Sequence, residues 1–87
     1  EVASYLAEMD VIAGGADTWS LDVVPSIDPM EPYPGHVILI KEHGIYILES
    51  MNTGALADDD VNEFLFVLGQ AKIRGAVQMI INPIAIH

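Results

Sequence analysis

Residues 36–49 read HVILIKEHGIYILE and predict a helix that passes directly into a strand. Gly44 stands where such a helix would end, because glycine readily adopts the left-handed conformation found at helix C-termini. The next residues, Ile45–Leu48, are β-branched, aromatic or apolar, which favours a strand. A helix followed at once by a strand is typical of a parallel arrangement, so the stretch predicts an α/β fold.

The segments before this stretch predict a helix, a strand and a loop. Residues 1–9 place apolar side chains on one face at helical spacing. A short buried strand is expected at residues 11–13, ended by the glycine pair at 14–15. Residues 24–35 contain four of the five prolines, a density that neither a helix nor a central strand tolerates. We therefore expect an irregular loop there.

The segments after it are predicted from weaker signals. Residues 51–60 favour a loop or short turn, and its aspartates at 58–60 favour a solvated charge run over a calcium site, because the EF-hand glycine and distal glutamate are missing. Residues 64–68 satisfy both helical and strand spacing, and we predict a buried strand. Pro83 restricts residues 84–87 to an edge or exit strand.

Composition excludes several classes of function. The chain has 87 residues, 13 acidic against 3 basic, and 52% hydrophobic content. With so few cations it has no basic patch, so we expect no nucleic acid and no membrane surface among its partners. No apolar run approaches the roughly 20 residues of a membrane span. The apolar content predicts a folded protein, which we expect in the cytoplasm.

The length allows one domain with a thin core. Because the chain has no cysteine, its stability must come from packing, from a metal held by histidine and carboxylate, or from a partner. The chain opens on Glu1 rather than methionine, and residues 1–9 read as a continuation of a sequence already under way. We therefore expect a fragment or a processed subunit.

Two polar residues beside apolar segments are candidates for chemistry. Glu49 ends the predicted strand, and ligands of α/β folds bind at the carboxyl ends of strands; the alternative is a merely solvated strand end. His36 follows the proline-rich loop, where it suits a metal ligand or a general base, or a structural role. We prefer structural explanations for the other two histidines. His43 lies in a predicted helix cap, and His87 lies at the end of the chain.

The segment DTWSLD, residues 17–22, concentrates polar side chains around the single tryptophan. Asp17, Ser20 and Asp22 suit turn chemistry, because such side chains bond neighbouring backbone groups. The alternative is that these residues and Trp19 line a pocket for a planar substrate. Both interpretations stay open.

Several short pieces of the chain stand in the order found in one known family. They are YLAE at 5–8, GADTWSLD at 15–22, PSIDP at 25–29, His36, GIYILE at 44–49, KI at 72–73 and GA at 75–76. Across nearly the whole chain, this ordered set resembles the cyclase, or kynurenine-formamidase-like, family of metal-dependent hydrolases.

The resemblance implies a swivelling β/β/α fold, a zinc or manganese centre, and hydrolysis of an amide or cyclic amide C–N bond. The family's His-x-Gly-Thr-His-x-Asp metal motif is absent from the chain. Residues 1–87 therefore resemble the carboxyl-terminal part of one cyclase-like domain, completed by another chain or a missing segment. The expected partners are this remaining part of the hydrolase and a small-molecule substrate, in an oligomer.

The resemblance also assigns roles to single residues. Glu49 matches a glutamate that contacts the metal and helps to move protons, and His36 matches a histidine that binds metal or acts in acid/base catalysis. Asp17, Ser20 and Asp22 match a stretch that supports the site.

The chain departs from the family pattern near its end. Where the family has a Gly-Ser-Pro turn and an arginine, residues 78–80 read QMI. This apolar segment changes the expected pocket wall. A noncatalytic structural subunit of the same ancestry, paired with an active chain, is the main alternative function, and an acidic stand-alone binding module is another. The presence of metal at Glu49 distinguishes the hydrolase from the noncatalytic subunit, whereas the stand-alone module requires the isolated chain to be a stable monomer.

Overall fold

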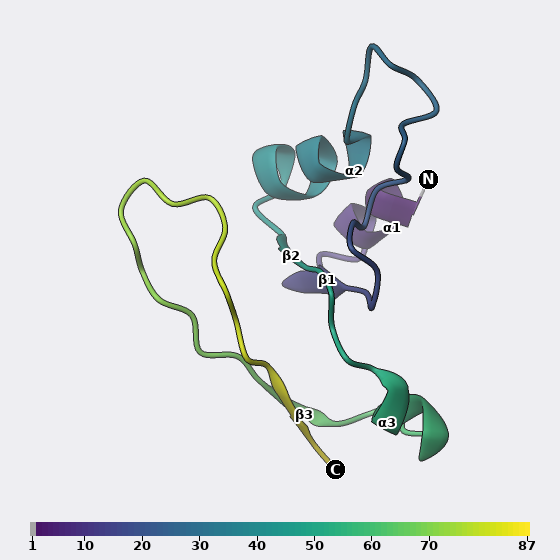
Figure 1. Ribbon diagram of the computed structural model, residues 1–87, viewed down its shortest axis with the longest axis vertical. Helices are drawn as coiled ribbons and strands as arrows, with labels where there is room; N and C mark the ends of the chain where they lie inside the picture. The colour runs from purple at the N-terminus through teal and green to yellow at the C-terminus, as the bar shows by residue number, and fades with distance from the viewer. Residues whose placement is uncertain (1) are drawn as a thin grey trace. The chain divides into compact units, whose positions relative to one another are not determined.

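The computed structural model describes residues 2–87 and divides into two units, Glu1–Thr53 and Gly54–His87. Figure 1 shows the elements in chain order: α1 (Val2–Glu8), β1 (Ala13–Gly15), α2 (Pro34–His36), the π-helix η1 (Val37–Glu42), β2 (Tyr46–Leu48), α3 (Gly54–Asp58), β3 (Leu65–Val67) and β4 (Ile84–Ile86). Helices and strands are mixed, as the sequence predicts. The single cyclase-like domain over residues 1–87 stays a prediction.

In the first unit, β1 and β2 pair in parallel, which confirms the predicted parallel step. The helix α1 also lies where it was predicted. The strand predicted at residues 11–13 is misplaced, because β1 begins at Ala13 and includes both glycines. A side-chain carbon at Gly15 would lie 3.3 Å from Cβ of Leu48, so the missing side chain allows the two strands to pair closely.

The helical segment before β2 ends as predicted. The π-helix η1 stops at Glu42, and Gly44 has a positive φ of 67°. Leu39 of η1 is completely buried, and Ile45 and Leu48 are nearly so; together they form the core. The core of the first unit thus lies at the contact between η1 and β2.

The start of this helical segment differs from the prediction. The helix begins at Pro34, inside the stretch predicted to be an irregular loop over residues 24–35. Proline suits the first turn of a helix because its fixed φ is already helical and an N–H there would have no partner within the helix. The winding of Val37–Glu42 as a π-helix has no counterpart in the sequence pattern.

The second unit contains α3 and an antiparallel ribbon of β3 and β4. The loop or turn predicted at residues 51–60 is wrong for Gly54–Asp58, which form α3; Ala55, Leu56 and Ala57 are good helix formers. The aspartates 58–60 are exposed, as expected of a solvated charge run.

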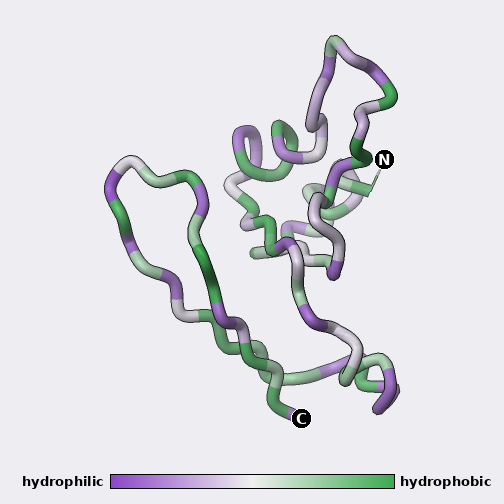
Figure 2. Tube along the Cα trace, in the orientation of Figure 1, coloured by the Kyte–Doolittle hydropathy of each residue, from purple (hydrophilic) through white to green (hydrophobic). Residues whose placement is uncertain are grey.

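The ribbon confirms two predicted strands and corrects their burial. The strand β3 lies within the predicted 64–68, and β4 follows Pro83 as the predicted edge strand. The strand β3 was predicted to be buried, yet Leu65 is 63% exposed, because no second layer covers the two-stranded ribbon within this unit. Figure 2 shows the hydrophobic colouring along both strands.

No helix within residues 2–87 has both the length and the apolar character that crossing a membrane requires.

Candidate functional site

Glu49 is held where strand β2 gives way to a loop. The neighbouring segment runs beside it, since the N–H of Ser50 donates to the carbonyl of Thr18 at 2.8 Å. Oε1 of Glu49 accepts a hydrogen bond from the backbone N–H of Leu21 at 2.8 Å. The Glu49 side chain is 30% exposed. Its carboxylate is therefore oriented by the 18–21 segment rather than free in water.

Asp22 fills the place of a cap at the start of α2. The residue before this helix, Tyr33, makes no side-chain capping bond. Instead the N–H of Gly35 donates to Oδ1 of Asp22 at 2.7 Å, and the N–H of His36 donates to Oδ2 at 3.0 Å. These are two of the N–H groups that the first turn of a helix leaves without internal partners. A carboxylate at this end also complements the helix dipole.

The same carboxylate holds the ring of His36. Nδ1 of His36 lies 2.6 Å from Oδ2 of Asp22, and the Asp22 side chain is only 10% exposed. The ring of Tyr33 meets the imidazole edge-on, with centroids 5.6 Å apart. The ring of His36 is thus fixed on one side by a hydrogen bond and packed against an aromatic neighbour.

These bonds also determine the acidity of Asp22. Burial acts to raise the pKa of its carboxyl group, but the hydrogen bonds from the ring of His36 and from the N–H groups of Gly35 and His36 outweigh burial. The pKa of Asp22 therefore lies below its ordinary value of 3.8. The group is a carboxylate throughout the physiological pH range.

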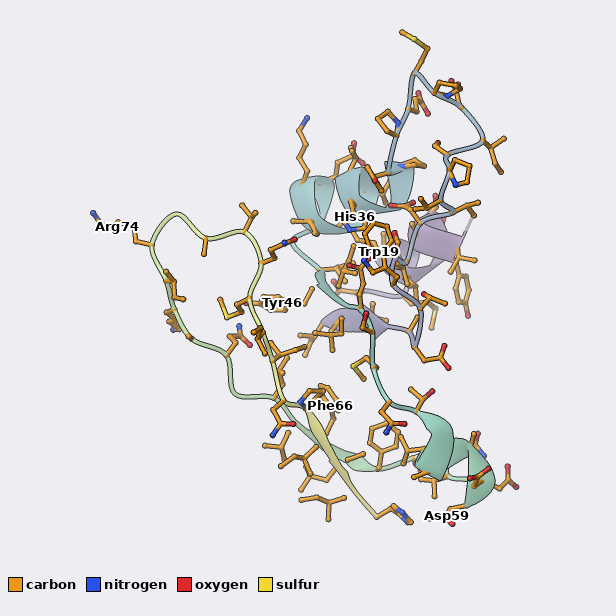
Figure 3. The ribbon with its side chains drawn as sticks, viewed as in Figure 1. Trp19, His36, Tyr46, Asp59, Phe66 and Arg74 are labelled. Atoms are coloured by element: carbon orange, nitrogen blue, oxygen red, sulfur yellow. The ribbon has the colours of Figure 1, made fainter. Side chains whose placement is uncertain are left out.

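The other ring nitrogen faces Glu49. Nε2 of His36 lies 3.4 Å from Oε1 of Glu49. When neutral His36 donates its Nδ1 hydrogen to Asp22, Nε2 has only a lone pair, so two acceptors face each other. This arrangement is favourable when a proton or a cation lies between them. Figure 3 labels His36 together with Trp19.

The pair of His36 and Glu49 suits the metal that the family resemblance implies. Two ligand atoms on a tetrahedral zinc ion, each about 2.1 Å from the metal, lie about 3.4 Å apart. Nε2 and Oε1 have this separation. Residues 2–87 contain no group of three or more histidine, aspartate or glutamate side chains able to hold an ion. The described residues thus place two potential ligand atoms together, and a complete metal site would need others.

The remaining candidates of the 17–22 segment take other places. Ser20 accepts a hydrogen bond at Oγ from the N–H of Asp22 at 3.2 Å, and Thr18 donates from Oγ1 to the carbonyl of Ser20 at 2.7 Å, which confirms turn chemistry here. Asp17 accepts from Oγ1 of Thr53 at 3.3 Å. The turn chemistry predicted for the carboxylates of Asp17 and Asp22 is therefore wrong, because both accept hydrogen bonds from residues distant in the sequence. Trp19 is 73% exposed, and its pocket role stays a prediction.

Two interactions of the site were missed in the sequence. The first is the hydrogen bond from the N–H of Leu21 to Glu49. Its donor is a backbone group, which every residue other than proline has, so the residue type gives no signal for it. The capping by Asp22 had a signal: the helix beginning at Pro34 has no serine, threonine, aspartate or asparagine immediately before it, so its N–H groups needed an acceptor from elsewhere.

No protein-family model, curated protein or solved structure matches the chain significantly.

Proposed function

We propose that the chain is part of a metal-dependent hydrolase that cleaves an amide or cyclic amide C–N bond, with His36 and Glu49 at a zinc or manganese centre. The observation that supports this most is the 3.4 Å separation of Nε2 of His36 and Oε1 of Glu49, with the opposite side of the ring held by Asp22. The remaining ligands come from the rest of the hydrolase, on another segment or chain. A cytoplasmic location belongs to the same proposal.

A zinc or manganese ion held by His36 and Glu49 would lower the pKa of a bound water to about 7 and would polarise the substrate carbonyl. Glu49 contributes a carboxylate whose Oε1 is held by the N–H of Leu21. Its other oxygen, Oε2, accepts the proton of the attacking water and returns it to the leaving nitrogen. His36 contributes Nε2 as a ligand, and the contact of its Nδ1 with Asp22 fixes the direction of the ring.

The metal site is tested by titrating the ¹⁵N-labelled chain with Mn²⁺ and recording amide NMR spectra. A paramagnetic ion broadens signals close to it even when binding is weak, which suits a site with two of its ligands. We expect broadening at Leu21 and His36, and separately at the exposed aspartates 58–60. In Glu49→Gln, the signals of Leu21 and His36 should recover while those of residues 58–60 stay broadened.

The matched control is Glu42→Gln, which removes an exposed carboxylate from the same part of the chain. It should leave the broadening at His36 unchanged. Wild-type spectra without broadening at His36, or equal broadening in Glu49→Gln, would refute the metal site and favour a noncatalytic subunit.

The hydrolase assignment is tested in the assembly that contains the remaining part of the enzyme. Release of amine from an amide or cyclic amide substrate should fall by about 100-fold or more in Glu49→Gln, the usual loss when an acid/base group is removed. Turnover that is retained by an intact Glu49→Gln assembly contradicts the role of Glu49.

A further inference from the structure

We infer that Asp22 is a positioning residue that fixes His36 as the tautomer with hydrogen on Nδ1, so that Nε2 keeps its lone pair toward Glu49. The inference rests on the proposed function only for the use of Nε2 as a ligand. The tautomer itself follows from the contacts around the Asp22 carboxylate.

Both carboxylate oxygens of Asp22 accept hydrogen bonds from the backbone. Oδ1 accepts from the N–H of Gly35, and Oδ2 accepts from the N–H of His36, at 2.7 and 3.0 Å. The carboxylate therefore has no freedom to turn away from the imidazole, and with a side chain 10% exposed it is largely shielded from water.

Nδ1 of His36 lies 2.6 Å from Oδ2 in this fixed arrangement. A carboxylate oxygen only accepts hydrogen bonds, so a bare Nδ1 would bring two lone pairs together at that distance. A hydrogen on Nδ1 turns the contact into a short, charge-assisted bond. The neutral ring then has its second nitrogen, Nε2, without hydrogen and directed toward Glu49.

Metal-binding histidines commonly donate their other N–H to a carboxylate, which fixes the tautomer and raises the basicity of the ligand atom. Asp22 has this relation to His36. Its carboxylate bonds Gly35 and His36, so its effect on Nε2 passes through the imidazole.

The test uses Asp22→Asn, which keeps the shape of the side chain and replaces one oxygen by an NH₂ group. Of the two backbone bonds to this side chain, the one from Gly35 is shorter, at 2.7 Å against 3.0 Å from His36. We therefore expect the amide oxygen at the Oδ1 position, with the NH₂ group facing Nδ1 at the expense of the bond from the N–H of His36. A donor opposite Nδ1 makes that nitrogen the acceptor and moves the ring hydrogen to Nε2. The variant should thus have the opposite tautomer.

The readout is the ¹⁵N chemical shifts of the His36 ring in the metal-free chain, about two pH units above the ordinary histidine pKa of about 6.5. Wild type should show a protonated Nδ1 and a bare Nε2, and Asp22→Asn the reverse. The matched control is Asp17→Asn, with the same change of charge on the same loop and a bond to Thr53 instead. It should keep the wild-type pattern.

A bare Nδ1 in the wild-type chain overturns the inference, whether or not Asp22→Asn folds. An unchanged tautomer in folded Asp22→Asn overturns it as well, provided that the amide signal of Gly35 shows its hydrogen bond to be retained. Affinity for Zn²⁺ alone should fall about 10- to 100-fold in Asp22→Asn, as for other partners of metal-bound histidines. The expected tautomer in a chain that binds neither Zn²⁺ nor Mn²⁺ at His36 supports the role of Asp22 and refutes only the proposed function.

Discussion

Oδ1 of Asp22 lies 2.7 Å from the backbone nitrogen of Gly35, and Gly35 is buried. A side-chain carbon placed on Gly35 would lie 2.6 Å from the same oxygen. Glycine is thus the residue that lets a carboxylate come close enough to bond both the helix and the ring of His36. The orientation of the candidate site depends on this close approach.

Gly35→Ala should destabilise the chain by about 1–3 kcal/mol, because the added methyl group displaces the Asp22 carboxylate from its backbone donors. Urea denaturation measures the change. Gly69→Ala is the control, since a side-chain carbon there meets no atom within 4 Å. An equal, small effect of both substitutions would show that the Asp22 contact is not tight.

The free energy of unfolding should fall at low pH as the carboxylate of Asp22 is protonated. Its pKa is below 3.8 in the folded chain, so the folded state binds this proton less readily than the unfolded state. The contribution is therefore present above pH 3.8 and is lost as pH falls through the lower folded-state pKa. Urea denaturation at a series of pH values should show a shallower acid loss in Asp22→Asn than in wild type. Parallel curves would contradict this sign.

Leu39→Ala should cost about 2–5 kcal/mol, the usual loss when a buried leucine is truncated. Leu39 is completely buried at the contact of η1 and β2, whereas its neighbour Ile40 is 49% exposed. Ile40→Ala is therefore the control and should change stability by a much smaller amount. Circular dichroism during thermal unfolding measures both. Equal losses of stability in the two variants would contradict the position of Leu39 in the core.

Glu49→Gln should leave the free energy of unfolding within about 0.5 kcal/mol of wild type, because the amide oxygen still accepts the N–H of Leu21. Glu49→Ala removes this acceptor and should cost about 1 kcal/mol, a modest loss because water reaches the half-buried group. Chemical denaturation of the two variants separates the loss of charge from the loss of the hydrogen bond. A Gln variant as unstable as the Ala variant would contradict the bond to Leu21.

The sequence predicted the parts of the fold that local signals determine. The glycine at position 44 and the apolar residues 45–48 act within one short stretch, and both the helix end and the strand β2 lie there. Pro83 likewise predicted an edge strand from the loss of a single N–H. The sequence predicts that Glu49 and His36 share one site, and in the structure Nε2 of His36 lies 3.4 Å from Oε1 of Glu49.

The remaining features depend on contacts between distant residues. Asp22 bonds His36 across 14 positions, and no local rule assigns that acceptor to the helix. The glycine pair at 14–15 predicts the end of a strand, whereas both glycines lie within β1, where the small size of Gly15 allows the approach of Leu48. Tyr33 adopts a left-handed backbone conformation at φ 64°, which its residue type disfavours. Each of these features depends on a neighbouring residue that the hydrophobic periodicity of the sequence does not predict.

The ribbon of β3 and β4 has only two strands, so each strand has one edge whose backbone groups face no other strand of the unit. Such edges are templates for pairing between molecules. Residues 64–87 contain no aspartate or glutamate to repel an approaching copy. In concentrated solution, the isolated chain is accordingly prone to aggregation through this ribbon, and its handling calls for dilute samples or for a strand that covers the open edge.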